Sequence, residues 1–177
     1  NVLEYDDVMN TQREIIYSQR REVLNTENIE DIILQLAKGK TDKIVESYFK
    51  NIDNIDDIDF ETVNLMFNDL LKTENFIKKE DIEDLDTSEI YELVDKKVKA
   101  LYEDKLKEAE KINAVEPIKK VQRYMILSVV NNKWMDHIDA ISQLKDGIGL
   151  RAYGQKNPVE AYKIESYDMF ESLIDSI

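Results

Sequence analysis

The chain has 177 residues, of which 42% are hydrophobic and 35% are charged, with 4 glycines, 2 prolines and no cysteine. This composition predicts a folded protein rich in helices, and it excludes a disulfide framework and a metal site built on thiolates. The net charge of -14 argues against general nucleic-acid binding, and no apolar stretch approaches the roughly 20 residues that span a bilayer.

The charge is distributed unevenly along the chain. Residues 51–90 contain 13 acidic and 3 basic residues, whereas residues 117–165 contain 5 acidic and 8 basic residues. A solvated surface is the ordinary explanation of such an acidic block. The change of sign nevertheless predicts two regions with different surroundings. Because the chain opens on Asn1 and not on methionine, we expect it to be part of a longer protein.

The first 50 residues have the apolar pattern of an amphipathic helix. Apolar side chains recur at helical spacing over residues 5–23, and again over residues 29–48. The polar residues 25–28 offer a break or a kink between these two stretches. We therefore expect one long helix, or two nearly collinear helices, ending near Lys50.

The middle of the chain is expected to be a set of short helices and loops. Residues 51–59 alternate Ile with Asp and Asn. Alternation can indicate a strand, but Asp and Asn are poor strand formers, so an acidic loop is favoured. A short helix is predicted over residues 60–71. Asp86 and Glu89 form a capping-box pattern that begins a longer helix, whose apolar face extends over residues 90–109.

The last third of the chain has the pattern of a helical hairpin. Pro117 suits the first turn of a helix, and an apolar stripe follows over residues 121–144. Three of the four glycines fall within residues 147–154, which predicts a loop. Residues 157–160, Asn-Pro-Val-Glu, combine an N-cap, a proline at the first helical position and a capping glutamate. A final helix is therefore expected up to Ile177.

These elements predict an all-α fold. Two helices joined by a short loop form an antiparallel hairpin, and both carry apolar stripes that need burial. The first helix carries a matching stripe. We therefore expect a long scaffold helix packed against both helices of the hairpin, with a small helical domain inserted between them.

Catalytic and metal-binding patterns are absent from the sequence. There is no G-x-x-x-x-G-K-[ST] phosphate loop, no H-E-x-x-H and no Cys/His cluster. A Ser-His-Asp triad is not excluded by counting residues, but no nucleophile elbow is present. We therefore predict no catalytic residue, no metal ligand and no cofactor within this chain.

Two polar groups still have a functional alternative. His137, the single histidine, stands between Asp136 and Asp139 and could be a general base oriented by a carboxylate. The favoured interpretation is a polar helical residue beside the core. Asp6 and Asp7 could form an acid or metal pair, but neighbours on a helix point about 100° apart. Charge that complements the helix dipole, or contact with a neighbouring domain, explains this pair better. An acid-pair hydrolase is the least favoured interpretation.

The expected tip of the hairpin is a further candidate site. Tyr153 lies there between Leu150, Arg151 and Lys156. An aromatic residue at such a tip has few neighbours to bury it. Glycines on both sides make the segment adaptable, so Tyr153 is a candidate contact for another polypeptide.

Several blocks of the sequence resemble one known protein family. They are residues 1–13 (NVLEYDDVMNTQR), 133–139 (KWMDHID), 147–158 (GIGLRAYGQKNP) and 165–170 (ESYDMF). The first block resembles the start of the helical scaffold, and the other three resemble the two-helix finger, of the SecA family of ATP-driven preprotein translocases. The middle of the chain matches no motif and is assigned by position to the helical wing domain. The resemblance thus divides the chain into scaffold (1–50), wing (51–115) and two-helix finger (116–177).

The resemblance also implies partners and contact residues. The scaffold helix would contact the nucleotide-binding domains of the longer protein, and the finger would contact the preprotein at the SecYEG channel. ATP and Mg would belong to the longer protein, so this part would not itself be an enzyme. The protein would act in the cytoplasm and peripherally on the cytoplasmic face of the plasma membrane, without nucleic acid. The implied domain contacts are Asp6, Asp7, Asn10, Gln12 and Arg13, and the implied fingertip residues are Leu150, Arg151, Ala152, Tyr153, Gly154 and Gln155.

An alternative function remains open at the level of sequence. A helical protein-interaction adaptor with no motor attached would have the same periodicity and composition. A phosphate-loop motif upstream in the parent gene would favour the motor, and its absence would favour the adaptor.

Overall fold

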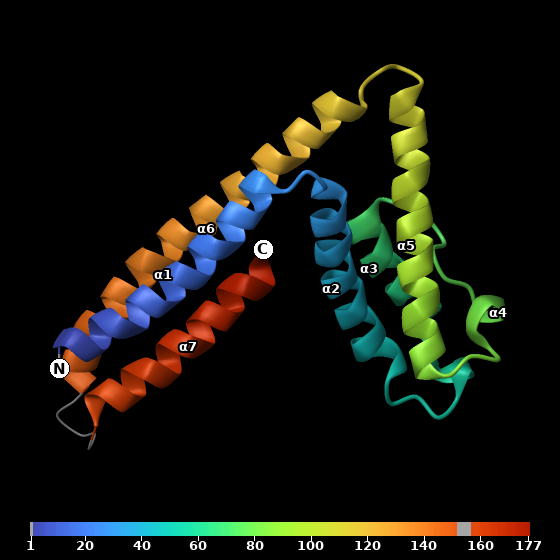
Figure 1. Cartoon of the computed structure of the whole chain (residues 1–177). Coiled ribbons are helices and arrows are strands. Elements are labelled where there is room, and N and C mark those ends of the chain that lie inside the picture. The colour runs from blue at the N-terminus through green and yellow to red at the C-terminus, as the bar shows by residue number, and fades with distance from the viewer. Residues whose placement is uncertain (1, 152–156) are drawn as a thin grey trace. The chain divides into compact units, whose positions relative to one another are not determined.

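The computed structural model describes residues 2–151 and 157–177, and every regular element in these ranges is helical (Figure 1). The all-α prediction is therefore confirmed. None of the described helices has a stretch long and apolar enough to cross a bilayer. The elements are α1 (Val2–Asn25), α2 (Ile29–Phe49), the 3-10 helix η1 (Ile55–Asp57), α3 (Phe60–Leu71), α4 (Lys79–Ile82), α5 (Thr87–Glu110), α6 (Val115–Arg151) and α7 (Pro158–Ser176).

The chain forms two compact units. The bundle unit comprises Asn1–Ile29 and Pro117–Ile177, and the inserted unit comprises Glu30–Glu116. The break expected near residues 25–28 is present, since α1 ends at Asn25 and α2 begins at Ile29. The inserted unit begins at Glu30, and the division at residue 51 that the family resemblance implied for its wing domain stays a prediction. The inserted unit includes α2 because the apolar face of this helix packs within it.

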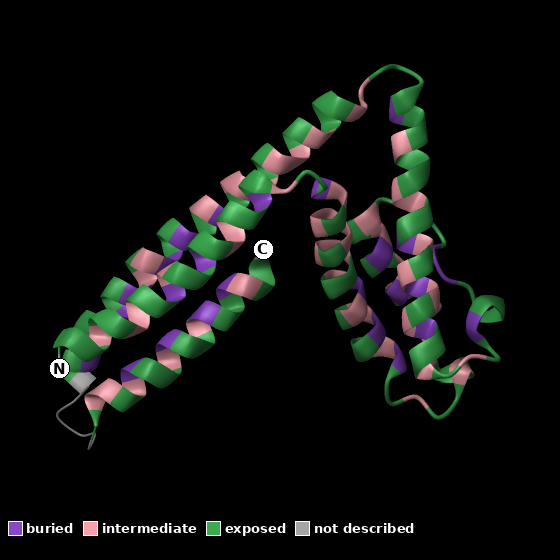
Figure 2. Ribbon diagram, viewed as in Figure 1, coloured by how far each residue is buried: buried purple, intermediate pink, exposed green. Residues whose placement is uncertain are grey.

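The bundle unit is an antiparallel hairpin of α6 and α7 with α1 lying along it (Figure 1). Near the hairpin end, Leu144 and Ile148 of α6 pack against Tyr162 of α7. Far from the hairpin end, Trp134 of α6 packs against Phe170 of α7. The helix α1 contributes side chains to both apolar clusters. Figure 2 shows buried positions recurring along the helices of the bundle unit. The expected packing of the first helix against both hairpin helices is confirmed.

The inserted unit has its own hydrophobic core. The side chains come from α2, α3, α4, α5 and the segment before α4, and the most buried of them are less than 2% exposed. Phe67 of α3 and Phe76 stack with ring centroids 4.6 Å apart. The core residues are Val45, Phe49, Val63, Phe67, Phe76, Ile77, Ile82, Ile90, Val94 and Val98.

The predicted helix starts are observed where a side chain caps the backbone. Asp86 accepts a hydrogen bond from the amide of Glu89, and the Glu89 carboxylate accepts one from the amide of Asp86, both at 2.8 Å. Asn157 caps α7 by accepting from the amide of Glu160 at 3.3 Å. Pro117 lies in the first turn of α6, as expected. These caps explain why local sequence located the ends correctly.

The helix α6 continues into the segment that the sequence assigns to a loop. Gly147 and Gly149 are helical, and α6 continues to Arg151. Glycine costs a helix about 1 kcal/mol relative to alanine. Ile148 lies between these glycines and is only 3% exposed in the apolar cluster with Tyr162. Burial of its side chain offsets the glycine penalty, so the helix continues through a sequence that local propensity assigns to a loop.

Candidate protein-interaction site in the helical bundle

A buried polar link joins all three helices of the bundle unit. The amide Nε2 of Gln12 in α1 donates to the carbonyl oxygen of Ser166 in α7 at 3.2 Å. Its Oε1 lies 2.7 Å from Nε2 of His137 in α6. Gln12 and His137 are 5% exposed and Ser166 is fully buried. The link therefore crosses the apolar interior, where an unpaired polar group is costly.

The hydrogen bonds define which ring nitrogen of His137 faces Gln12 as a donor. Because the Gln12 amide nitrogen donates to Ser166, its oxygen faces the imidazole and accepts from Nε2–H. Burial lowers the pKa of His137 below its ordinary value, so the ring is neutral near pH 7. Asp136 and Asp139 are exposed, and neither has a hydrogen bond to the ring in the described structure. This arrangement supports the structural interpretation of His137 over that of a general base.

Trp134 anchors the apolar part of the same region. It is 5% exposed and shares a cluster with Ile16, Phe170 and Leu173. Its indole ring lies 5.5 Å from the imidazole ring of His137, measured between centroids. The indole Nε1 is buried with no hydrogen-bond partner in the described structure. Packing, and not hydrogen bonding, therefore holds this side chain in place.

The candidate domain contacts on α1 fall into two groups. Asp6, Asp7 and Asn10 are exposed, and Arg13 is half-buried and donates to the Asn10 amide oxygen at 2.9 Å. Asp6 also lies 4.0 Å from the ammonium of Lys145 on α6. Gln12 faces the interior instead. Among the described residues, no group of three or more His, Asp or Glu side chains is arranged to hold a metal ion.

The expected fingertip is described only on its α6 side. Leu150 is 80% exposed, one residue before the end of α6. Arg151 is the last residue of α6. The other expected fingertip residues, Ala152, Tyr153, Gly154 and Gln155, lie outside the described residues. The structure therefore places one exposed apolar side chain at the end of the hairpin helix.

Two features of the bundle unit were not found from the sequence. Arg123 of α6 donates to the carbonyl oxygens of Val23, Leu24 and Thr26 at 2.8 to 3.0 Å, which caps the carboxyl end of α1. This cation also complements the negative end of the helix dipole. Its partners are about 100 residues away in sequence, so no local pattern signals it.

The second feature is an apolar groove between α1 and α7. It has a volume of about 510 Å³ and is lined by apolar side chains together with polar and charged ones. The helical periodicity places these residues on their helices, but only the packing of α1 against α7 opens the groove. The apolar lining residues are Val8, Ile15, Phe170 and Ile174, and the charged ones are Lys163, Glu171 and Asp175.

Comparison of the sequence with known proteins identifies a family and several relatives. The family described as "SecA Wing and Scaffold domain" matches residues 1–177. The protein translocase subunit SecA of Carboxydothermus hydrogenoformans is 39% identical over 177 residues, which is 100% of this chain and 20% of the relative. Those of Clostridium acetobutylicum and Acetivibrio thermocellus are 38% and 40% identical over 99% and 98% of the chain.

The similarity covers both the bundle unit and the inserted unit. The chain spans about a fifth of the length of these relatives. The middle residues, which carry no recognisable motif, are thus included in the match. With a scaffold helix, a helical insertion and a two-helix hairpin in the same order along the chain, this protein belongs to the SecA wing and scaffold family.

Proposed function

We propose that this chain is the scaffold, wing and finger part of a longer ATP-driven protein translocase that moves preproteins through the SecYEG channel. The support is the family match along residues 1–177 and relatives that are named protein translocase subunit SecA. In this proposal the longer protein acts in the cytoplasm and peripherally on the cytoplasmic face of the plasma membrane. The partners are the preprotein, the channel and the nucleotide-binding domains of the longer protein.

In this proposal α1 couples the nucleotide-binding domains to the finger formed by α6 and α7. The single observation that carries the coupling is the buried link from Gln12 to His137 and Ser166. A shift of α1 along the finger would break both hydrogen bonds and leave buried polar groups unpaired, at about 1–3 kcal/mol each. The finger therefore follows α1 as a body.

The exposed residues of α1 would contact the nucleotide-binding domains and so transmit their motion to the helix. Asp6, Asp7 and Asn10 are exposed, and Arg13 is half-buried beside Asn10, so these side chains are accessible to a neighbouring domain. Gln12 belongs to the other side of the coupling, because it faces the finger. Of the five residues that the family resemblance grouped together, Gln12 would thus have a different task from the other four.

The tip of the finger would contact the moving polypeptide. Its proposed residues are those at the end of α6 and those that follow it in sequence, including Leu150, Arg151 and Tyr153. The exposure of Leu150 supports an apolar contact there. An aromatic ring such as that of Tyr153 can lie against varied side chains without demanding one sequence, which a motor with many substrates requires.

ATP hydrolysis would take place outside this chain. The sequence has no phosphate-binding loop, so we expect no tight binding of ATP by residues 1–177 alone. Isothermal titration calorimetry of the purified chain with ATP and Mg checks this expectation. A dissociation constant in the micromolar range would contradict it, since about 8 kcal/mol of binding free energy needs a built site.

The decisive experiment compares transport with ATP hydrolysis in the full-length protein. Tyr153→Ala should slow the translocation of a preprotein into vesicles more than it slows basal ATP hydrolysis, and Tyr153→Phe should retain more transport. Transport by Tyr153→Ala at the wild-type rate would contradict the fingertip role. Loss of both activities together would show that the tip acts through the folding or regulation of the motor.

A further inference from the structure

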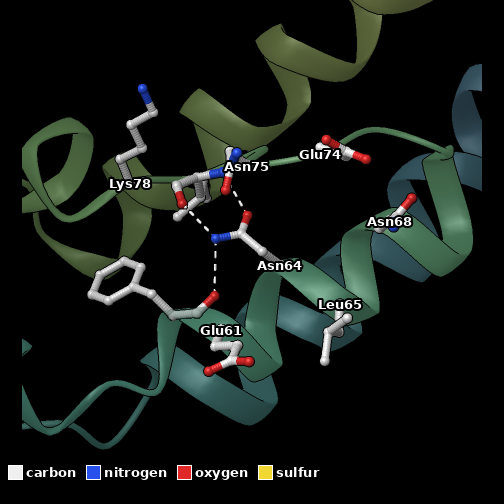
Figure 3. A pocket seen from close by; sticks show the side chains of 9 residues that line it. Glu61, Asn64, Leu65, Asn68, Glu74, Asn75 and Lys78 are labelled. Carbon is white, nitrogen blue, oxygen red and sulfur yellow. Dashed lines mark hydrogen bonds between the residues drawn. The ribbon is translucent and has the colours of Figure 1, made fainter.

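The inserted unit has a hollow beside α3 that the functions above do not use. It has a volume of about 510 Å³ and lies between α3 and the segment that precedes α4 (Figure 3). Phe60 and Leu65 provide its apolar lining, and Asn68 and Asn75 provide amides. It is an open recess on the surface of one compact unit.

The wall of this hollow is held in place by one side chain. The Asn64 amide nitrogen donates to the carbonyl oxygens of Phe60 and Ile77 at 2.9 and 2.8 Å, and its oxygen accepts from the amide of Ile77 at 2.9 Å (Figure 3). The neighbouring side chains of Phe76 and Ile77 are buried in the core. The recess is therefore pre-formed, and a ligand would not have to order it.

An exposed apolar surface continues from the hollow along α3. Leu65, Met66 and Leu70 are 60%, 44% and 38% exposed. Met66 and Leu70 are four residues apart and share one side of the helix, at the margin of the buried face formed by Val63 and Phe67, whereas Leu65 points away from that buried face, on the side of the hollow. The helix α3 thus exposes Leu65 in the hollow and Met66 with Leu70 beside it, and exposed apolar side chains that gather on a charged protein mark a contact site for another molecule.

The charge around this surface determines which partner fits it. Residues Glu30–Glu116 contain 24 acidic and 13 basic residues, a net charge of -11, whereas the rest of the chain has 14 acidic and 11 basic residues, a net charge of -3. Glu61 and Glu74 line the hollow, with Lys78 as the one cation in its lining. The Asp69 carboxylate beside Leu70 is 91% exposed and lies 3.7 Å from the ammonium of Lys72. Such surroundings repel nucleic acid and acidic peptides and attract cations.

We propose that this α3 surface binds a polypeptide segment in which apolar side chains stand next to Lys or Arg. The apolar side chains would cover Leu65 and Met66, and the cation would lie beside Glu61 or Glu74. Exposed ion pairs contribute little free energy, so the apolar contact would supply most of the affinity and the carboxylates would supply the selectivity. The identification of this segment as part of a transported preprotein rests on the proposed function; the binding itself does not.

The test uses the chain of residues 1–177 and three labelled peptides in a fluorescence anisotropy titration. One peptide is built from leucine and lysine, the second has glutamate in place of lysine, and the third has serine in place of leucine. We expect the leucine-lysine peptide to bind about ten-fold more tightly than either of the others. Raising the salt concentration should reduce the difference in affinity between the lysine and glutamate peptides, because exposed charges are screened.

Matched variants locate the binding surface. The double substitution Leu65→Gln and Met66→Gln should weaken binding of the leucine-lysine peptide by about ten-fold, and Glu61→Gln with Glu74→Gln should reduce the preference for lysine over glutamate. The control is Val121→Gln with Met125→Gln on α6, whose side chains are 56% and 58% exposed in the bundle unit. All of these positions are on the surface, and equal helical circular dichroism confirms that the variants fold.

Three outcomes would overturn the proposal: no saturable binding up to about 1 mM peptide, equal binding of the lysine and glutamate peptides, or equal weakening by the α6 control. Each is measured without ATP, channel or vesicles, so each is independent of the translocation assay. Normal peptide binding beside normal transport by Tyr153→Ala would reject the fingertip function and leave the α3 site intact. The reverse combination would reject the α3 site alone.

Discussion

Trp134 is the residue whose truncation should cost the bundle unit most. It is 5% exposed between Ile16, Phe170 and Leu173, so Trp134→Ala leaves a cavity that the surrounding helices cannot fill. We expect the free energy of unfolding to fall by about 3–5 kcal/mol. Thermal and urea unfolding followed by circular dichroism measure the loss. Met135→Ala is the control, because its side chain is adjacent in sequence but 64% exposed; equal losses in the two variants would contradict the packing.

His137 gives the bundle unit a dependence on pH with a defined sign. Burial lowers its pKa below the ordinary value of 6.5, so the unfolded chain binds a proton at a higher pH than the folded chain does. The free energy of unfolding should therefore decrease as the pH falls through about 6.5, and this contribution levels off below the folded pKa.

The variant His137→Gln separates the effect of His137 on the pH dependence of stability from the effect of the carboxylates. It removes the single histidine and keeps a side-chain amide that can donate to Gln12. The stability of the wild type relative to this variant should decrease between about pH 7.5 and pH 5 in urea titrations. A difference that stays constant over this range would show that His137 has the same pKa in the folded and unfolded chains.

At the scale of the element, the end of α6 contains two glycines that its helix does not require. Neither Gly147 nor Gly149 has a positive φ, and a Cβ added at either would meet no atom within 4 Å. Gly147→Ala and Gly149→Ala should therefore each stabilise the bundle unit, by about 0.4–1 kcal/mol, because alanine restricts the unfolded chain and favours the helix. Thermal unfolding of the single variants measures the gain, and destabilisation would show that the segment is a loop, as its sequence predicts.

At the scale of the molecule, the two units should unfold separately. Phe67 is fully buried in the inserted unit, whereas Trp134, the single tryptophan, lies in the bundle unit. Phe67→Ala should destabilise the inserted unit by about 3–5 kcal/mol. The transition in far-ultraviolet circular dichroism should broaden toward lower temperature, while the midpoint of tryptophan fluorescence stays unchanged.

The control for this experiment is Met66→Ala, whose side chain is 44% exposed on the same helix. It should leave both signals close to the wild type, since truncation of an exposed side chain has a small effect. A fluorescence midpoint that moves together with the circular dichroism in Phe67→Ala would show a single cooperative unit.

The sequence by itself determined the helices and most of their ends. Apolar periodicity and side-chain caps act within a few residues, so Asp86 with Glu89 and Asn157 with Pro158 locate helix starts without any tertiary information. The break after Asn25, the absence of a strand over the described part of 51–59 and the burial of Trp134 follow from the same local signals. The family resemblance of the terminal blocks was also readable in this way.

Only the tertiary structure decided which helix faces pack against one another and which polar residues are buried. Glutamine is usually a surface residue, yet Gln12 is buried, because its side-chain amide forms hydrogen bonds with His137 and Ser166. Arg123 caps α1 across about 100 residues of sequence, and Ile148 keeps α6 helical through two glycines by its burial. The apolar face of α2 joined the inserted unit for the same reason. These outcomes depend on contacts between distant segments, whose free energies exceed the local propensities of about 1 kcal/mol that a sequence pattern reports.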